Sequence, residues 1–322
     1  MSNPAVFNCP ACKTPLTQQG ASLTCPSCAQ TVATISEDVA IFQDTKDKEG
    51  FFERRACEEL QVYYKNYSRK EFDDALARRD LWNMDIANKK VGITQKLWWE
   101  RSIGRIVDQN VLEVGCGVNY LISHWLNNNN NVVAFDICKE SVLFTKKITD
   151  ILGFPKEKLT LAVADAQTTS FNRTFDVINM NNVLHHIKDK RSVFSGLRDS
   201  LSDQGHLLLV EPNYYYPPRW AIETNLFDKV NVIKGYFVKN YLIEKGEKAA
   251  IFSELKEDLA ATGYTIVENF KDPNYLGYFT LHWLPSSTKL GRLIFLSDKY
   301  FFDRILPAKL APFEFIIAKK TR

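Results

Sequence analysis

Two hydrophobic patterns alternate along the chain from about residue 106 onward, and they predict alternating strands and helices. Short apolar runs rich in β-branched residues predict buried strands, and apolar residues three and four apart predict amphipathic helices. The predicted strands are 111–114, 132–136, one ending at 163–166, 175–181, one within 205–211, 264–270 and 312–319. A helix and a turn precede the fifth strand within 197–212, and a helix at 251–262 stops at Gly263. Strands that alternate with helices predict an α/β fold with a mainly parallel sheet.

The most specific pattern follows the first of these strands. Gly115 and Gly117 open a turn, and Tyr120–Leu126 has the apolar spacing of a helix. A strand that turns through glycines into a helix places backbone N–H groups beside a nucleotide-like ligand. Asp136 ends the next strand, where a carboxylate accepts hydrogen bonds from ribose hydroxyls. The NAD motif requires a third glycine where Tyr120 stands, so a nicotinamide cofactor is disfavoured.

Further motifs stand in a fixed order around this turn. Glu113 precedes the glycines, 163–166 ends the third strand, 175–187 contains the fourth strand with its loop, and Glu211–Pro212 ends the fifth. Over about residues 106–270 this set resembles the class I S-adenosylmethionine (SAM)-dependent methyltransferases. The resemblance implies a Rossmann-like, doubly wound, seven-stranded sheet and SAM as the methyl donor.

The resemblance also implies a role for each residue near the donor. Glu113 would hold the loop backbone or reach the SAM amino group, Asp136 would bind the ribose, and Asp165 would accept from the adenine amine. Ile137 would pack on the adenine, and Asn119 stands where the family commonly has a small residue. The complete set of predicted donor-binding residues is Glu113, Gly115, Gly117, Asn119, Asp136, Ile137, Asp165, Ala166 and Asn181.

His185 and His186 are the candidate catalytic residues. A neutral histidine at the crevice can take a proton from an oxygen or nitrogen acceptor while the methyl group is transferred. The Leu-His-His-Ile sequence recurs in the family with unrelated substrates, which favours a structural role for one histidine. Alignment of donor and acceptor can also suffice without a base. The sequence leaves these alternatives open.

Four cysteines near the start form two Cys-x-x-Cys pairs separated by twelve residues, and they are Cys9, Cys12, Cys25 and Cys28. Two such pairs supply the four thiolates of a tetrahedral zinc site. The segment resembles a zinc ribbon, as found in activator subunits of some tRNA and protein methyltransferases and at the N-terminus of some rRNA guanine methyltransferases. A piece of this size has too small a core to fold unaided, so structural Zn²⁺ would supply folding free energy. Whether the ribbon also contacts substrate is left open.

The chain is thus divided into a zinc ribbon at 1–45, a helical cap or linker at 46–105 and a methyltransferase domain at 106–322. Insertions at about 212–250 and 271–310 interrupt the last domain and are rich in aromatic residues, as acceptor pockets often are. From residue 286 to the end, eight Lys or Arg stand against three Asp or Glu on an amphipathic background. Such a segment lies on an anionic membrane surface or packs over the sheet.

Composition adds two limits. The chain has 322 residues, a net charge of +3 and seven cysteines, of which three are scattered, so no disulfide framework is indicated. No signal peptide or apolar run of membrane-spanning length is present. A cytoplasmic enzyme is expected, with peripheral contact to a membrane as the alternative.

Three function classes remain. The favoured one transfers a methyl group to an oxygen or nitrogen of a small-molecule, sugar or lipid-linked acceptor. An rRNA or tRNA methyltransferase is the second, but residues 1–45 carry one Lys against one Glu and two Asp, which counts against RNA binding by the ribbon. A non-catalytic partner protein with the same fold is the third.

Overall fold

The computed structural model describes residues 6–42, 102–117, 121–216, 251–271 and 310–321, together with a few positions between 293 and 307. The predicted helical cap at 46–105 and the two insertions fall almost entirely outside these residues. Within the described part of the chain, no helix is both long and apolar enough to cross a lipid bilayer.

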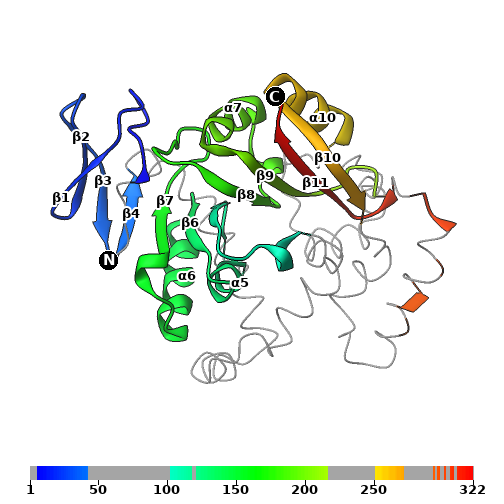
Figure 1. Cartoon of the computed structure of the whole chain (residues 1–322), viewed down its shortest axis with the longest axis horizontal. Coiled ribbons are helices and arrows are strands. Elements are labelled where there is room, and N and C mark those ends of the chain that lie inside the picture. Colours follow the sequence, from blue (N-terminus) through cyan, green and yellow to red (C-terminus); the bar gives the residue numbers. More distant parts are fainter. Residues whose placement is uncertain are drawn as a thin grey trace, which may run out of the picture.

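Seven strands make the core sheet that the sequence predicts (Figure 1). They are β5 (Asn110–Val114), β6 (Asn131–Asp136), β7 (Leu159–Val163), β8 (Phe175–Asn181), β9 (Leu201–Pro212), β10 (Tyr264–Lys271) and β11 (Phe313–Lys320). Their order in the sheet is β7-β6-β5-β8-β9-β11-β10. Strands β5 to β9 pair in parallel, and β11 runs antiparallel to both β9 and β10. The predicted Rossmann-like, doubly wound sheet is therefore confirmed.

The order of the strands reverses at β5. The chain runs outward from β5 to β6 and β7 and then crosses back to β8 on the other side of β5. Loops that leave the carboxyl ends of β5 and β8 therefore diverge, and open α/β sheets bind their ligands at such a point. The glycine turn follows β5 and the histidine pair follows β8, so the topology brings both motifs to this edge.

Helices cover the two faces of the sheet, and successive residues of β5 face opposite clusters. Val111 packs with buried residues of α5 (Leu121–Asn127) and α6 (Lys139–Leu152). Leu112 and Val114 pack with residues of α7 (Lys190–Ser200) and α10 (Phe252–Ala261) on the other face. This alternation is the period of two that a strand buried on both faces requires.

The N-terminal segment contributes four more strands to the same sheet. They are β1 (Thr17–Gln19), β2 (Ser22–Cys25), β3 (Gln30–Ser36) and β4 (Val39–Phe42), paired in antiparallel order. Strand β4 then pairs in parallel with β7 at the edge of the core sheet. Phe7 and Phe42 of this segment join the core cluster that contains Phe135 and Phe171. The ribbon therefore continues the core sheet, which the sequence did not predict.

One boundary differs from the sequence-based prediction. The turn expected between the helix and the fifth strand lies inside β9, which begins at Leu201 directly after α7. Leu201 of β9 pairs with Phe175 of β8, and the next pair joins His206 to Val177. Four residues of β9 therefore lie opposite a single residue of β8. The extra residues, including Gly205, therefore bulge out of the ladder instead of separating two elements.

Candidate functional site

The two glycines of the turn after β5 meet different surroundings. Gly115 has φ +66° and Gly117 has φ +49°, a region that other residues enter only at a cost. A Cβ at Gly115 would lie 2.4 Å from Cγ2 of Val183, whereas a Cβ at Gly117 would meet no atom within 4 Å among the residues that the structure describes. Gly115 is thus required by packing against the turn after β8, and Gly117 borders the space into which a ligand can come close to the backbone.

Asp136 at the end of β6 connects this turn to the next loop. Its Oδ2 accepts a hydrogen bond of 2.8 Å from the N–H of Gly117, and its Oδ1 accepts one of 2.8 Å from the N–H of Cys138. Ile137, predicted to pack on the adenine, is half-buried beside it. Each oxygen of an ionised carboxylate has two lone pairs, so one carboxylate can accept more than two hydrogen bonds. The carboxylate is held by backbone groups in the position that the sequence predicts.

Asp165 lies in a buried turn just after β7. Its Oδ1 accepts from the N–H of Gln167 at 2.9 Å, and its backbone carbonyl accepts from the N–H of Thr169 at 3.0 Å. Ala166 is half-buried next to it. Because β6 and β7 are adjacent parallel strands, Asp136 and Asp165 follow neighbouring carboxyl ends of the sheet. This is the arrangement expected of residues that bind two parts of one nucleoside.

Glu113 is placed deeper than the other predicted donor-binding residues. It is fully buried, and its Oε2 accepts from Nε1 of Trp125 at 2.8 Å. Nδ2 of Asn179, directly across on β8, donates to both carboxylate oxygens at 2.9 and 3.0 Å. Burial raises the pKa of Glu113 to about 8, although the hydrogen bonds from Trp125 and Asn179 lower it. Glu113 therefore connects β5, β8 and α5 beneath the glycine turn.

The raised pKa of Glu113 predicts a specific dependence of stability on pH. Since the folded-state pKa of about 8 exceeds the ordinary value of 4.5, the free energy of unfolding should fall as pH rises from about 5 to about 8. Glu113→Gln removes this titration and should flatten the dependence across that range. Urea denaturation at several pH values checks this. A variant that loses stability with pH as steeply as the unmodified protein would contradict the assignment.

Asn181 is the last residue of β8, and Asn182 follows it. Asn182 has φ +59°, and its Nδ2 donates to Oδ1 of Asn181 at 2.8 Å. Asparagine tolerates the left-handed region better than most residues, and non-glycine residues in this region are concentrated at functional sites. Both side chains are half-buried at the edge where the glycine turn also lies. Asn119 lies outside the described residues, so its predicted role stays a prediction.

The histidine pair forms a short 3-10 helix, η5 (Leu184–His186), after β8. Nδ1 of His185 lies 2.8 Å from Oε2 of Glu211, and the two side chains are 4% and 1% exposed. Oε1 of Glu211 accepts from the N–H groups of Val183 and Leu184 at 2.9 and 2.7 Å. The ring of His186 lies beside that of His185, with centroids 4.0 Å apart, and is half-buried. The ring of His185 is thus fixed by Glu211, and the more accessible ring of His186 packs against it.

Glu211 is a residue of this site that the sequence-based search did not select. Burial acts to raise its pKa, but the interaction with His185 and the two backbone N–H donors outweigh burial, so the pKa is lowered. Glu211–Pro212 marked the end of the fifth strand in the sequence. An acidic residue at a buried strand end beside the switch point was the available signal.

The four cysteines of the N-terminal segment come together as predicted. Sγ atoms of Cys9, Cys12, Cys25 and Cys28 all lie within 4.8 Å of one another. The separations are 3.4 Å for Cys12 from Cys25 and from Cys28, and 4.0 Å for Cys9 from Cys28. A tetrahedral zinc with Zn–S bonds of about 2.3 Å places its sulfurs about 3.8 Å apart. The donor set and its dimensions fit zinc.

A sequence profile described as "Methyltransferase domain" matches residues 112–207. This segment runs from β5 through most of β9 and contains the glycine turn, Asp136, Asp165 and the histidine pair. Over residues 112–207 the chain therefore matches a methyltransferase domain, in agreement with the resemblance found in the sequence.

Several known proteins are similar to this chain over part of its length. The malonyl-[acyl-carrier protein] O-methyltransferase 2 of Ilyobacter polytropus is 31% identical over 102 residues, which are 31% of this chain and 38% of that protein. The chain therefore matches well under half the length of this relative. Among solved structures, the [4+2]-cyclase SpnF has a TM-score of 0.48 at 15% identity, covering 70% of this chain and 80% of that one. A SAM-dependent methyltransferase from Clostridium acetobutylicum has a TM-score of 0.47 at 12% identity, covering 74% and 97%.

Proposed function

We propose that the protein is an enzyme that transfers the methyl group of SAM to an oxygen or nitrogen of a small-molecule, sugar or lipid-linked acceptor. The observation that carries this proposal is the link between Asp136 and Gly117. The carboxylate of Asp136, at the end of β6, is held 2.8 Å from the N–H of Gly117 in the turn after β5, so the two loops meet at the carboxyl edge of the sheet. This combination suits a ribose diol and an adjoining flexible chain, the two parts of SAM that a backbone loop can bind closely.

When bound, SAM supplies a methyl group on a positively charged sulfur that an acceptor oxygen or nitrogen displaces in line. The residues of the chain then bind and orient the reactants. Asp136 and Gly117 would hold the ribose and the methionine portion, while Asp165 and Ala166 would hold the adenine. Asn181, at the end of β8, would face the reacting end of the crevice. Aligning two reactants can supply much of the rate enhancement of such a transfer.

His186 and His185 are proposed to handle the proton that the acceptor loses. His186 is the more accessible of the two, so we assign contact with the acceptor to it. The ring of His186 would take the proton from the acceptor as the methyl group is transferred, and His185, whose Nδ1 lies 2.8 Å from Oε2 of Glu211, would keep the ring of His186 in place through their contact. The bond to Glu211 also fixes the orientation of the His185 ring.

The proposed acceptor class has two supports. The relative from Ilyobacter polytropus is named as an O-methyltransferase of a malonyl group on a carrier protein, which is consistent with an oxygen acceptor on a small group. The exposed apolar side chains of Leu293, Phe301 and Ile305, at 57% to 61% exposure, lie in the basic C-terminal segment. They favour a protein that touches an anionic membrane surface and meets a lipid-linked acceptor there.

RNA is the competing acceptor, because the ribbon resembles those of rRNA-modifying enzymes. The experiment is to incubate the full-length protein with SAM labelled in its methyl group and a cell extract divided into RNA, protein, lipid and small-molecule fractions. We expect label in the lipid or small-molecule fraction. Label in RNA alone would overturn the acceptor class, and label in no fraction would overturn the enzyme assignment. Boiled protein serves as the control.

We further propose that the cysteine cluster holds one structural Zn²⁺. Freshly purified protein should contain about one zinc per chain, and Cys25→Ser should lose most of it because only three thiolates then remain. Elemental analysis together with protein quantification gives the ratio. Cys138→Ser is the matched control, since Cys138 is also buried but lies outside the cluster. Absence of zinc from fresh protein would end this proposal.

A further inference from the structure

The N-terminal ribbon covers the edge of the core sheet at β7. Val39, Ala40 and Ile41 of β4 pair with Leu161, Ala162 and Val163. Strand β7 leads directly into the turn that carries Asp165. The ribbon is therefore packed on the one core strand whose end carries the proposed adenine contact.

A second set of contacts joins the ribbon to the residues just after Asp165. The backbone N–H of Asn8 donates to the carbonyl of Ser170 at 2.8 Å, and its side-chain Nδ2 donates to the carbonyl of Phe171 at 2.8 Å. The N–H of Asn172 donates to the carbonyl of Val6 at 3.0 Å. Asn8 thus fixes two successive carbonyls of this stretch.

Lys13 reaches the same stretch nearer to Asp165. Its Nζ donates to the carbonyl of Thr168 at 3.3 Å. The N–H groups of Thr168 and Thr169 donate to the carbonyl of Asp165 at 3.1 and 3.0 Å, and Oγ1 of Thr169 does so at 2.6 Å. A short series of hydrogen bonds therefore runs from the ribbon to the backbone that aims the Asp165 carboxylate.

Both contacting residues adjoin metal-ligating cysteines. Asn8 precedes Cys9 and Lys13 follows Cys12, so the first Cys-x-x-Cys pair lies between them. Within the pair, the backbone is closed by hydrogen bonds from the N–H of Lys13 to the carbonyl of Cys9 and from the N–H of Cys9 to the carbonyl of Thr14. A segment so short is held in one conformation by its metal, whose binding free energy is also folding free energy.

We propose that the metal-loaded cysteine cluster positions the turn that carries Asp165, with Asn8 and Lys13 as positioning residues, so that affinity for the methyl donor depends on metal occupancy. This inference rests on the proposed function, because it takes Asp165 as a donor contact. The ribbon then acts on the donor side of the reaction, without touching the acceptor.

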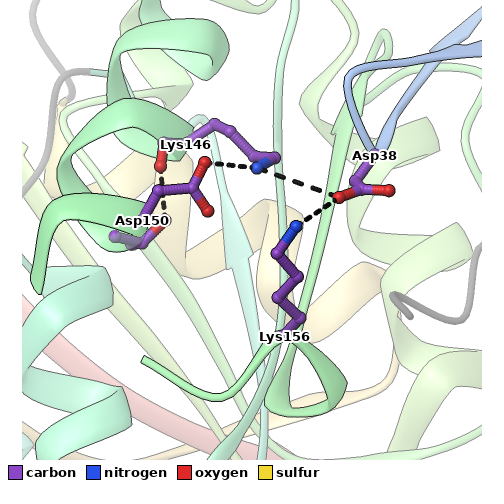
Figure 2. A network of polar contacts seen from close by, with 5 residues as sticks. Asp38, Lys146, Asp150 and Lys156 are labelled. Atoms are coloured by element: carbon purple, nitrogen blue, oxygen red, sulfur yellow. Dashed lines mark hydrogen bonds and ion pairs between the residues drawn. The ribbon is translucent and has the colours of Figure 1, made fainter. Parts of the chain in front are cut away.

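The opposite end of the ribbon supplies a matched control. Asp38, in the turn between β3 and β4, accepts from Nζ of Lys156 at 2.9 Å and lies 4.0 Å from Nζ of Lys146 (Figure 2). These ion pairs join the ribbon to α6 and to the loop before β7, away from the Asp165 turn. They are partly exposed, and exposed ion pairs contribute little to stability. Asp38→Asn therefore alters the same interface without altering the contacts of Asn8.

The test is calorimetric titration of the full-length protein with S-adenosylhomocysteine (SAH), before and after zinc removal with a chelator and after zinc is restored. We expect zinc removal and Asn8→Ala each to weaken binding by about tenfold or more, which corresponds to about 1.4 kcal/mol. Asp38→Asn should bind as the unmodified protein does, and restored zinc should recover the affinity. Equal binding by all forms would overturn the inference.

Hydrogen exchange of residues 165–172 provides a readout that needs no donor. Amide exchange in this stretch, including the N–H of Asn172, should be faster in zinc-depleted protein and in Asn8→Ala, and unchanged in Asp38→Asn. If the unmodified protein fails to bind SAH but exchange responds as stated, the proposed function fails while the positioning holds. If SAH binds and neither binding nor exchange responds, only the present inference fails.

Discussion

Replacing Asp136 with alanine should weaken SAH binding by at least about a hundredfold while leaving the protein folded. The substitution removes the acceptor of the N–H groups of Gly117 and Cys138 and, with it, the proposed acceptor for the ribose hydroxyls. Hydrogen bonds to a charged group contribute about 1.5–3 kcal/mol each. Losing the two bonds from the ribose hydroxyls therefore accounts for about a hundredfold loss of affinity. The two backbone donors can turn to water, so we expect only a modest loss of stability.

Calorimetry of the variant measures this effect, and circular dichroism with thermal unfolding shows that the fold is kept. Glu157→Gln is the control, because it removes an exposed carboxylate that lies in a short 3-10 helix away from the crevice. Unchanged SAH affinity in Asp136→Ala would show that this carboxylate does not bind the donor. Asp136 would then only hold the backbone of the two loops through Gly117 and Cys138.

Gly115→Ala should chiefly lower the stability of the protein, whereas Gly117→Ala should chiefly lower its affinity for the donor. At Gly115 the added Cβ would meet Val183 at 2.4 Å in a left-handed backbone, so we expect a loss of about 2–4 kcal/mol in the free energy of unfolding. At Gly117 the space is open, so only the backbone cost of about 1–2 kcal/mol applies. The methyl group would there intrude on the bound donor, and affinity should fall instead.

Chemical denaturation and SAH titration of the two variants separate these effects. The account predicts that Gly115→Ala is the less stable protein and that Gly117→Ala is the weaker binder relative to its stability. Equal stabilities would show that Val183 shifts freely. Normal SAH affinity in Gly117→Ala would show that the donor does not pass over this glycine.

The succession of strands and helices along the chain was predictable because it rests on short-range patterns. Apolar runs, the glycine turn and the acidic strand ends each depend on neighbouring residues, and their alternation indicates a mainly parallel sheet. The doubly wound order within that sheet was implied by the resemblance of these motifs to the class I methyltransferases. The pairing of β4 with β7 could not be predicted in this way. It joins residues 39–41 to 161–163, far apart in sequence, and nothing in either strand specifies its partner.

The site shows the same contrast between local and distant signals. Asp136 and the four cysteines lie in spaced motifs, and the structure places them where those motifs imply. Glu113 was predicted to hold the loop backbone or to reach the SAM amino group, and this stays a prediction. The contacts of its carboxylate with Trp125 and Asn179 in the core were not foreseen, because they depend on how the helix and the strand pack. Glu211 was overlooked for the same reason, since its partner His185 stands 26 residues away.

The measurement that tests the central claim most directly is calorimetric titration of the full-length, zinc-loaded protein with SAH, with and without total RNA. The account predicts one binding event per chain with a dissociation constant in the micromolar range, unchanged by RNA. Tighter binding with RNA would contradict the proposed acceptor class. If folded, zinc-loaded protein does not bind SAH, the loops after the carboxyl ends of β5, β6 and β7 do not form a methyl-donor site.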